Sequence, residues 1–286
     1  MKCMWKELLG ILPASIRQEA DKYGREAGQE IRLRRGLPAR MILPGHEVEF
    51  GGVMTEEDLQ YVISAASAYS PWASPGAARG YLTAAGGHRI GICGEAILKE
   101  GKMTGIRSPT SLCIRVARDF PGLAEPLRDI TGSILLVGPP GSGKTTLLRD
   151  LIRQRSDHHP GSIAVVDERG ELFPVESAAS FPRGSKTDIL TGCGKKQALD
   201  CLLRTMSPGC IAVDEITEES DCEALIRASR CGVSLLATVH AGSLEELDKR
   251  PVYRTLLSHS IFETAVILTP DKSFRAERIR QWSRSY

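Results

Sequence analysis

An eight-residue segment near the middle of this 286-residue chain limits what the sequence can fold into. Residues 138–145 read GPPGSGKT and match the pattern G-x-x-x-x-G-K-[ST] at every fixed position. The apolar run 134–137 leads directly into the segment, and residues 146–149 continue from it as a helix. A glycine-rich loop between a buried strand and a helix is the phosphate-binding loop of α/β nucleotide-binding domains, so the sequence predicts such a domain.

The residue types in this loop suit the phosphates of a nucleoside triphosphate. Glycines allow backbone N–H groups to turn inward around a phosphate, and the helix N-terminus adds partial positive charge. We expect Lys144 to reach the β- and γ-phosphates and the Thr145 hydroxyl to bind Mg²⁺. The predicted cofactors are therefore ATP and Mg²⁺, and the predicted nucleotide-binding residues are Gly138, Pro139, Pro140, Gly141, Ser142, Gly143, Lys144, Thr145 and Thr146.

A pair of carboxylates, Asp214-Glu215, follows the short apolar run 210–213. A strand end next to a phosphate-binding loop is where a partner for Mg²⁺ belongs. We therefore assign Asp214 to the metal, through water, and Glu215 to the polarisation of the attacking water. Solvated acids that end a strand are the alternative interpretation of this pair.

A second acidic pair, Asp167-Glu168, follows the run 163–166 and repeats this design one strand earlier in the sequence. Glu168 therefore competes with Glu215 for the role of general base, and a solvated strand end is again the alternative. The next residue, Arg169, either serves a phosphate or pairs with an acid.

A third apolar run, 235–239, ends in His240. Imidazole can hydrogen-bond and can change its charge near neutral pH, which makes His240 a candidate sensor of the γ-phosphate. A purely structural role is the alternative for this histidine.

The pattern of the chain from residue 132 onward predicts the fold class. The strands that we expect are apolar runs without alternation, typical of a parallel sheet buried on both faces, at 134–137, 163–166, 211–213 and 233–239. The helices that we expect between them are 145–155, 195–206 and 220–230. Strands that alternate with helices predict an α/β fold, here a P-loop, RecA-like, mostly parallel sheet with helices on both faces. We expect this ATPase domain to cover residues 132–286.

Residues 1–118 show a different pattern, which predicts a smaller α+β domain before the ATPase domain. Residues 5–27 indicate one or two helices, and Thr55 with the acidic residues after it indicates the start of another. The strands that we expect are two short ones within 30–43, a β-hairpin over 81–98 and a further strand over 111–117. Residues 119–131 contain Pro121, Gly122 and Pro126, and we interpret them as a linker.

Composition limits the partners and the compartment. The formal net charge is +2 and aromatic residues make up 5% of the chain, so neither charge nor stacking side chains favour direct binding of nucleic acid. The eight cysteines include no C-x-x-C pair, which argues against a zinc site. We find no signal peptide and no apolar segment of the roughly 20 residues that span a bilayer, which favours a cytoplasmic protein.

Two other classes of P-loop protein fit the sequence less well. A nucleic-acid-directed ATPase of the helicase-loader type is the main alternative, and it would need the basic, aromatic surface that the composition does not favour. A small-molecule kinase usually needs a mobile lid that closes over a second substrate. The smaller domain here precedes the P-loop and does not interrupt the ATPase core, which disfavours a kinase.

The order of these motifs resembles the secretion ATPase superfamily, the motors of type II and type IV secretion and of pili. In that superfamily an acidic box, a Walker B strand and a His box follow the P-loop, and they match Asp167-Glu168, Asp214-Glu215 and residues 238–242 here. A closer resemblance is to the family of stage III sporulation AA proteins of endospore formers. It rests on the segments EIRLR (30–34), GGHRIGI (86–92), IRVAR (114–118), the P-loop as far as Arg149, VDER (166–169), MSP (206–208) and KRP (249–251).

The resemblance implies an ATPase motor that forms a homo-hexamer and acts in the mother cell at the engulfed forespore. It would drive or assemble a secretion-like membrane channel, as a peripheral protein docked on integral membrane proteins of that channel. After the Walker B acids such proteins often carry a Gly-Arg or Arg-Asp step, where this chain reads Ile216-Thr217-Glu218-Glu219. Glu218 and Glu219 are thus close enough in sequence to Asp214 to affect metal binding.

Arginines from outside the ATPase domain are expected to complete the site. One lysine and one metal face a highly charged triphosphate, so further positive charge on the γ-phosphate is a large catalytic contribution. In the secretion ATPases such arginines come from strands of the domain before the P-loop, and the matching strands here are 88–92 and 113–118. The resemblance therefore assigns this role to Arg89 and Arg115, acting on a neighbouring subunit, with Arg107 and Arg118 behind them. Solvated or ion-paired strand arginines are the alternative.

Overall fold

The computed structural model describes residues 2–67, 80–173 and 181–279. Within these ranges the chain forms two compact units, and the first gives way to the second between Asp119 and Phe120. Each unit has its own hydrophobic core. Among the described helices, none combines the length and the apolar character that crossing a membrane requires.

The second unit is built, in its described residues, on a seven-stranded sheet with the order β11-β10-β12-β13-β9-β14-β15. Its strands are β9 (Ile134–Gly138), β10 (Ile163–Asp167), β11 (Thr187–Thr191), β12 (Cys210–Val213), β13 (Ser234–His240), β14 (Thr264–Leu268) and β15 (Phe274–Arg278). Every neighbouring pair is parallel except β14 with β15. The carboxyl ends of the parallel strands therefore meet at one edge of the sheet.

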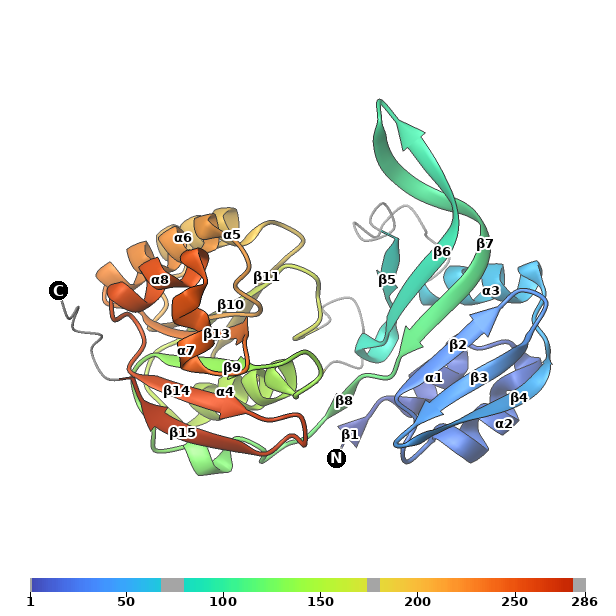
Figure 1. The fold of residues 1–286 in the computed structure, drawn as a ribbon, viewed down its shortest axis with the longest axis horizontal. Helices are drawn as coiled ribbons and strands as arrows, with labels where there is room; N and C mark the ends of the chain where they lie inside the picture. Colours follow the sequence, from blue (N-terminus) through green and yellow to red (C-terminus); the bar gives the residue numbers. More distant parts are fainter. Residues whose placement is uncertain (1, 68–79, 174–180, 280–286) are drawn as a thin grey trace. The chain divides into compact units, whose positions relative to one another are not determined.

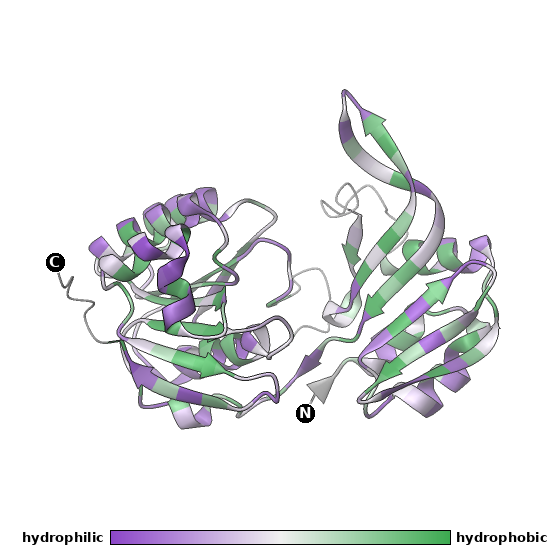
Figure 2. Cartoon of the chain, in the orientation of Figure 1, coloured by the Kyte–Doolittle hydropathy of each residue, from purple (hydrophilic) through white to green (hydrophobic). Residues whose placement is uncertain are grey.

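Helices cover both faces of this sheet (Figure 1). Helix α4 (Lys144–His158) packs against β9, β10 and β13 on one face. The helices on the other face are α5 (Lys195–Thr205), α6 (Glu219–Arg230) and α8 (Pro251–Ser258), with the short α7 (Leu244–Lys249) before α8. The central strands are buried along their length and are largely hydrophobic in Figure 2. The predicted fold class, a mostly parallel α/β sheet with helices on both faces, is confirmed.

Among the described elements of this unit, the sequence prediction lacks β11, β14, β15, α7, α8 and a short 3₁₀ helix at Glu125–Leu127. Strands β11 and β15 lie at the two edges of the sheet, where part of each strand is exposed, so they lack the unbroken apolar run of a central strand. Strand β14 has that run (TAVIL) and is fully buried. Helix α7 has a recognisable start, because the Ser243 side chain accepts a hydrogen bond from the Glu246 amide.

The segment that we expected to be a linker, residues 119–131, belongs from Phe120 onward to the second unit. It contains a short 3₁₀ helix, η4 (Glu125–Leu127), and buries Ala124 and Leu127. The carboxylate of Asp150 in α4 accepts hydrogen bonds from the amides of Gly122 and Ala124. These contacts hold the segment on α4, so its proline and glycine content reflects a tight turn and not a free connection.

The first unit is an antiparallel sheet with the strand order β4-β3-β2-β7-β6-β5 in its described residues. The strands are β2 (Glu30–Arg34), β3 (Pro38–Leu43), β4 (His46–Val53), β5 (Tyr81–Thr83), β6 (Arg89–Lys99) and β7 (Lys102–Arg115). The helices α1 (Trp5–Ile11), α2 (Ala14–Gly24) and α3 (Glu56–Ala66) cover one face. Strands β1 (Lys2–Cys3) and β8 (Arg118–Asp119) form a separate antiparallel pair.

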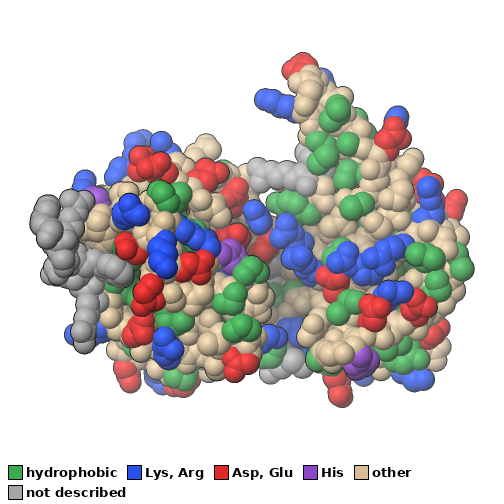
Figure 3. Space-filling view, viewed as in Figure 1, with side chains coloured by type: hydrophobic (Ala, Val, Ile, Leu, Met, Phe, Trp, Pro, Cys, Tyr) green, Lys and Arg blue, Asp and Glu red, His purple; other side chains and the backbone are tan. Residues whose placement is uncertain are grey.

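The local sequence explains the start of α3 and the burial pattern of the sheet. Thr55 and Asp58 form a capping box at the N-terminus of α3, where the sequence predicts a helix start at Thr55. Strands β2 and β3 alternate between buried and partly exposed residues, and the buried ones face the helices. The other face of this sheet carries basic side chains, including Arg32 and Arg40, and Figure 3 shows a band of Lys and Arg over this unit.

Strand β7 is longer than the sequence predicts. We expected a strand over 111–117, whereas β7 begins at Lys102, directly after the turn at Glu100-Gly101. Its first half pairs with the end of β6 as a two-stranded arm, in which Leu98 lies opposite Met103. Most residues of the arm are exposed, so the alternation between a buried and an exposed face, on which a strand prediction depends, is missing there.

Candidate active site

The phosphate-binding loop runs from the end of β9 into α4 and has the backbone geometry that its glycines permit. Gly141 and Gly143 have positive φ angles of 75° and 94°, which side-chain-bearing residues rarely adopt. A Cβ atom on Gly138 would lie 2.6 Å from the Ser142 hydroxyl, so this position requires glycine. The Ser142 hydroxyl is buried and has no hydrogen-bond partner among the described residues. The loop thus offers backbone and side-chain groups to a polar ligand.

Lys144 is the first residue of α4, and its ammonium group lies inside the loop. It donates hydrogen bonds to the carbonyl oxygens of Gly138 and Pro139, each at 2.8 Å. Only 5% of the residue is exposed, and this burial lowers the pKa of Lys144, against the opposing effect of Asp214 and Glu215. The cation is therefore held at the loop by carbonyl dipoles and by the acids that follow β12.

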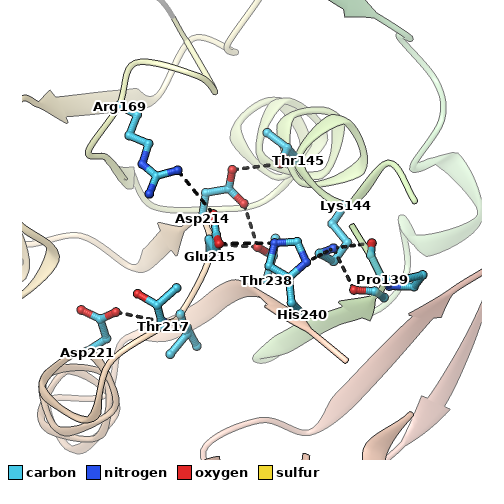
Figure 4. A network of polar contacts seen from close by, with 12 residues as sticks. Pro139, Lys144, Thr145, Arg169, Asp214, Glu215, Thr217, Asp221, Thr238 and His240 are labelled. Carbon is cyan, nitrogen blue, oxygen red and sulfur yellow. Dashed lines mark hydrogen bonds and ion pairs between the residues drawn. The ribbon is translucent and has the colours of Figure 1, made fainter. Parts of the chain in front are cut away.

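The predicted metal ligands, Thr145 and Asp214, are in direct contact. Thr145 Oγ1 donates to Asp214 Oδ2 at 2.9 Å, and Thr238 Oγ1 donates to Asp214 Oδ1 at 2.7 Å (Figure 4). The strand order explains the contact, because β13 lies between β9 and β12 and brings Thr238 beside Asp214. A hydroxyl and a carboxylate together, next to bound phosphates, are a donor set that suits Mg²⁺.

Glu215, the first candidate for the base, has a strained backbone. Its φ angle is 55°, in the left-handed region that a glutamate seldom occupies. The Thr238 hydroxyl accepts a hydrogen bond from the Glu215 amide at 2.8 Å, and the Thr238 carbonyl accepts one from Ile216. The Glu215 side chain is about one-third exposed, and its Oε2 lies 3.8 Å from Nη1 of Arg169. Backbone strain of this kind is common at functional sites.

His240, at the end of β13, lies between the candidate base and the P-loop lysine. Its Nδ1 is 3.0 Å from Lys144 Nζ, and its Nε2 is 3.4 Å from Glu215 Oε1 (Figure 4). Because an ammonium group can only donate, Nδ1 accepts, and the ring proton of the neutral form is on Nε2, facing Glu215. The register of β13 with β9 also places His240 opposite Gly138. The structure therefore brings His240, Lys144 and Glu215 together.

The second acidic pair is arranged differently. Asp167 is 2% exposed, and its carboxylate accepts hydrogen bonds from the amides of Glu171, Leu172 and Phe173. Burial raises the pKa of Asp167, while these amides oppose that shift. Asp167 thus holds the turn after β10. Glu168 forms an ion pair with Lys195, with Glu168 Oε2 3.0 Å from Lys195 Nζ.

The acids that depart from the secretion-ATPase pattern start helix α6. The Glu218 side chain accepts a hydrogen bond from the amide of Asp221, and Asp221 in return accepts from the amides of Thr217 and Glu218. Glu219 lies in the first turn of α6, where a negative charge is favourable. Thr217-Glu218-Glu219 therefore form a helix start in this structure.

The four arginines expected from the first unit have different surroundings. Arg89 of β6 lies opposite Arg115 of β7, and both lie on the open face of the sheet. The Arg115 side chain is 67% exposed, with a long contact of 3.8 Å to Glu30, and the Arg89 guanidinium is 4.6 Å from the centre of the Tyr81 ring. Arg107 pairs with Glu95 on the arm, whereas Arg118 donates to the carbonyl groups of Gly24, the last residue of α2, and of Gly28 beyond it.

Two residues of the site have no predicted role in the sequence, Thr238 and Tyr253. Thr238 is 1% exposed and contacts both Walker B acids through its hydroxyl. A hydroxyl residue inside an otherwise apolar strand is a signal that could have found it. The hydroxyl of Tyr253, a residue of helix α8, donates a hydrogen bond of 2.9 Å to the Ile216 carbonyl. No local sequence pattern marks that contact.

The fold and the site define a class of protein. The structure is similar to that of the ATPase DotB from Legionella pneumophila, with a TM-score of 0.57 and 16% identity, covering 91% of this chain and 77% of DotB. It is also similar to the pilus retraction motor PilT with bound ADP, with a TM-score of 0.58 and 18% identity, covering 88% of this chain and 76% of PilT. The fold is therefore that of the secretion ATPases.

The chain belongs to the family described as "Sporulation stage III, protein AA", whose model matches residues 4–280. It is 33% identical over 280 residues to the stage III sporulation protein AA of Bacillus subtilis (strain 168), covering 93% of this chain and 91% of that protein. The family resemblance found in the sequence is thus confirmed. The roles of the individual site residues stay predictions.

Proposed function

We propose that this protein is an ATPase motor that hydrolyses ATP to drive or assemble a secretion-like membrane channel during endospore formation. The observation that carries the proposal is the contact between Thr145 Oγ1 and Asp214 Oδ2 at 2.9 Å, beside a P-loop that holds Lys144. Membership of the sporulation family and the secretion-ATPase fold support the biological setting.

In the proposed site, each group of the loop binds one part of the nucleotide. The loop amides and the start of α4 bind the β-phosphate, and Lys144 exchanges its carbonyl partners for the β- and γ-phosphates. Thr145 and Asp214 would hold Mg²⁺, Asp214 through water. When bound, Mg²⁺ neutralises charge on the β- and γ-phosphates.

We assign the general base to Glu215 in preference to Glu168. Glu215 follows the metal-binding Asp214 directly, and the Glu168 carboxylate is paired with Lys195. Thr238 fixes the Glu215 backbone, and His240 Nε2–H orients the Glu215 carboxylate while its Nδ1 faces Lys144. In this arrangement His240 contacts both the base and the phosphate-binding cation. These two contacts would let it sense whether a γ-phosphate is bound.

We further propose that Arg89 and Arg115 of a neighbouring subunit complete the site within a homo-hexameric ring. They lie opposite each other on the open face of the first unit, and Arg107 and Arg118 stand behind them as candidates. The ring would be peripheral to the membrane, docked from the mother-cell cytoplasm on integral membrane proteins of the channel. Direct binding of nucleic acid is not expected.

The test uses the purified full chain with ATP and Mg²⁺. Phosphate release measures hydrolysis, and size-exclusion chromatography with light scattering, with and without a non-hydrolysable ATP analogue, measures assembly. We expect Mg²⁺-dependent hydrolysis and a ring whose formation depends on nucleotide. A monomer that hydrolyses ATP only with single-stranded DNA would instead identify the helicase-loader class. Absence of nucleotide binding would overturn the proposal as a whole.

Attachment to the membrane has its own measurement. The chain is expected to float with vesicles only when it is co-expressed with its integral membrane partner. Flotation of the chain with protein-free vesicles would show direct lipid binding and contradict docking through a partner.

A further inference from the structure

Lys195 occupies an unusual place for a cation. It is the first residue of α5, next to Lys196, and the first turn of that helix contains no acidic residue. The N-terminus of a helix carries partial positive charge, which disfavours lysine there. The Lys195 side chain is nevertheless only 10% exposed. A buried cation at a helix N-terminus needs specific negative partners.

Those partners come from two other elements of the second unit. Lys195 Nζ is 3.0 Å from Glu168 Oε2, at the end of β10, and 3.6 Å from Asp221 Oδ2, in the first turn of α6. The Glu168 side chain is 26% exposed and that of Asp221 is 7% exposed, so solvent screens this cluster only in part. One ammonium group thus connects the acidic box to the start of α6.

Through Asp221 the connection reaches the Walker B turn. The same oxygen, Asp221 Oδ2, accepts hydrogen bonds from the Thr217 amide at 3.1 Å and the Glu218 amide at 3.3 Å. These residues directly follow Asp214, Glu215 and Ile216, and Figure 4 shows Asp221 facing Thr217 across the start of α6. On the other side of the turn, Thr238 and Tyr253 hold Glu215 and Ile216.

The Lys195 side of the turn is lined mostly by polar and charged residues. It borders an open groove of about 890 Å³, lined among others by Glu168, Lys195, Thr217 and Asp221. The strained backbone of Glu215, with φ at 55°, persists only if its surroundings fix it from both sides. On the groove side, Asp221 with its cation fixes this turn through the Thr217 and Glu218 amides, and Arg169 lies 3.8 Å from the Glu215 carboxylate.

We propose that Lys195 is a positioning residue for hydrolysis. It forms ion pairs with both Asp221 and Glu168, ties the end of β10 to the turn after β12, and so keeps the Glu215 carboxylate in place. This inference rests on the proposed ATPase function. In the described part of the chain, the ion pairs of Lys195 run to Glu168 and Asp221 and not to the P-loop or the predicted metal ligands, so it acts on the turnover step and not on nucleotide binding.

The test compares Lys195→Met, Lys195→Arg and the control Lys196→Met in the full chain. Methionine keeps the length and helix propensity of lysine and removes its charge, whereas arginine keeps the charge. We expect Lys195→Met to lower kcat about 10- to 100-fold, as is typical of residues that orient a catalytic group, with KM for ATP within about twofold. Lys195→Arg is expected to recover most of kcat, and Lys196→Met, at an exposed neighbour, to match wild type.

Hydrogen exchange of a peptide covering residues 214–221 gives a second measurement that needs no turnover. We expect faster exchange of the Thr217 and Glu218 amides in Lys195→Met, and unchanged exchange in Lys196→Met. If the wild type did not hydrolyse ATP, the proposed function would fail. The exchange rates of the two variants would still test whether Lys195 holds the turn after β12 through Asp221. Unchanged exchange and kcat in Lys195→Met, an equal loss in Lys196→Met, or no recovery with arginine would each overturn the inference.

Discussion

The two units of this protein place their polar side chains in different ways. In the second unit the polar groups gather where β9, β10, β12 and β13 end, at one edge of a parallel sheet. In the first unit the sheet is antiparallel, helices cover one face, and arginines are spread over the strands of the other face.

This difference follows from strand direction. Parallel strands all end at the same edge, so residues that follow buried strands meet there whatever their separation in sequence. In an antiparallel sheet, neighbouring strands end at opposite edges, and side chains from different strands meet only on a shared face. The second unit can therefore assemble a site from strand ends, whereas the first unit can present a surface to another molecule.

The largest effect is expected from Lys144→Ala, which tests whether the chemistry belongs to the second unit. Lys144 would contact charge that develops on the transferred phosphoryl group, so its loss should lower hydrolysis at least about 10³-fold while the fold survives. Phosphate release and circular dichroism measure the two properties, with Lys196→Ala as the exposed control. A variant with wild-type turnover would remove the P-loop from the mechanism.

The next prediction tests whether the first unit is more than a surface, because it makes arginines of that unit part of the active site. Arg89→Ala and Arg115→Ala are each expected to lower hydrolysis by about 10³-fold if these arginines contact the γ-phosphate. Thr104→Ala, on the exposed arm, is the control within the same sheet.

Mixing then separates action within a subunit from action between subunits. Rings that contain both Arg115→Ala and Lys144→Ala chains have some sites with an intact lysine on one side and an intact arginine on the other. Activity should partly return in such rings. No recovery in rings shown to be mixed excludes action between subunits, and full activity of both single arginine variants excludes the role.

The variants Glu215→Gln and Glu168→Gln test which of two carboxylates in the second unit is the general base. Glutamine keeps the shape of the side chain and loses its basicity, so Glu215→Gln should bind ATP normally and hydrolyse it about 10²-fold more slowly. Glu168 is paired with Lys195, and Glu168→Gln should have the smaller effect. ATP binding and single-turnover hydrolysis distinguish the two. The reverse order of effects would make Glu168 the base, and two near-wild-type variants would rule out both.

The smallest effect is expected in the first unit, and it concerns how the stability of that unit depends on pH. His88 is fully buried, its Nδ1 accepts from the Ala117 amide and its Nε2 faces the Met4 carbonyl at 2.8 Å. Burial lowers the pKa of His88 below its ordinary value of 6.5, although the Met4 carbonyl and Glu7 oppose the shift. The unfolded chain therefore binds the proton first, so the contribution to stability is complete above about pH 6.5 and is lost as the pH falls through the lowered pKa.

Hydrogen exchange of the Ala117 amide and urea unfolding, each at pH 7.5 and at pH 5.5, measure this effect. His88→Gln should flatten the pH dependence, whereas the exposed His46→Gln should leave it unchanged. If His88→Gln kept the full pH dependence, another group would be responsible for it.

The sequence predicted some elements well because their signals are local. The P-loop needs only consecutive residues, and the helix start at Thr55 needs only the next helical turn. Edge strands such as β15 were missed because half-exposed strands have no unbroken apolar run. The arm of β6 and β7 was underestimated for a related reason, since neither of its faces is buried enough to impose alternation.

By itself, the sequence predicted the fold class of the second unit and the family, because the loop, the strand ends and the ordered motifs that carry them are short segments. Only the tertiary structure decided which of those segments are neighbours. It placed β13 between β9 and β12, which joins Thr238 and His240 to the Walker B acids, and it brought Lys195 to Glu168 and Asp221. The physical reason is that parallel strands are joined by long crossovers, so a strand's sequence fixes that it ends in a polar group but not which strand lies beside it.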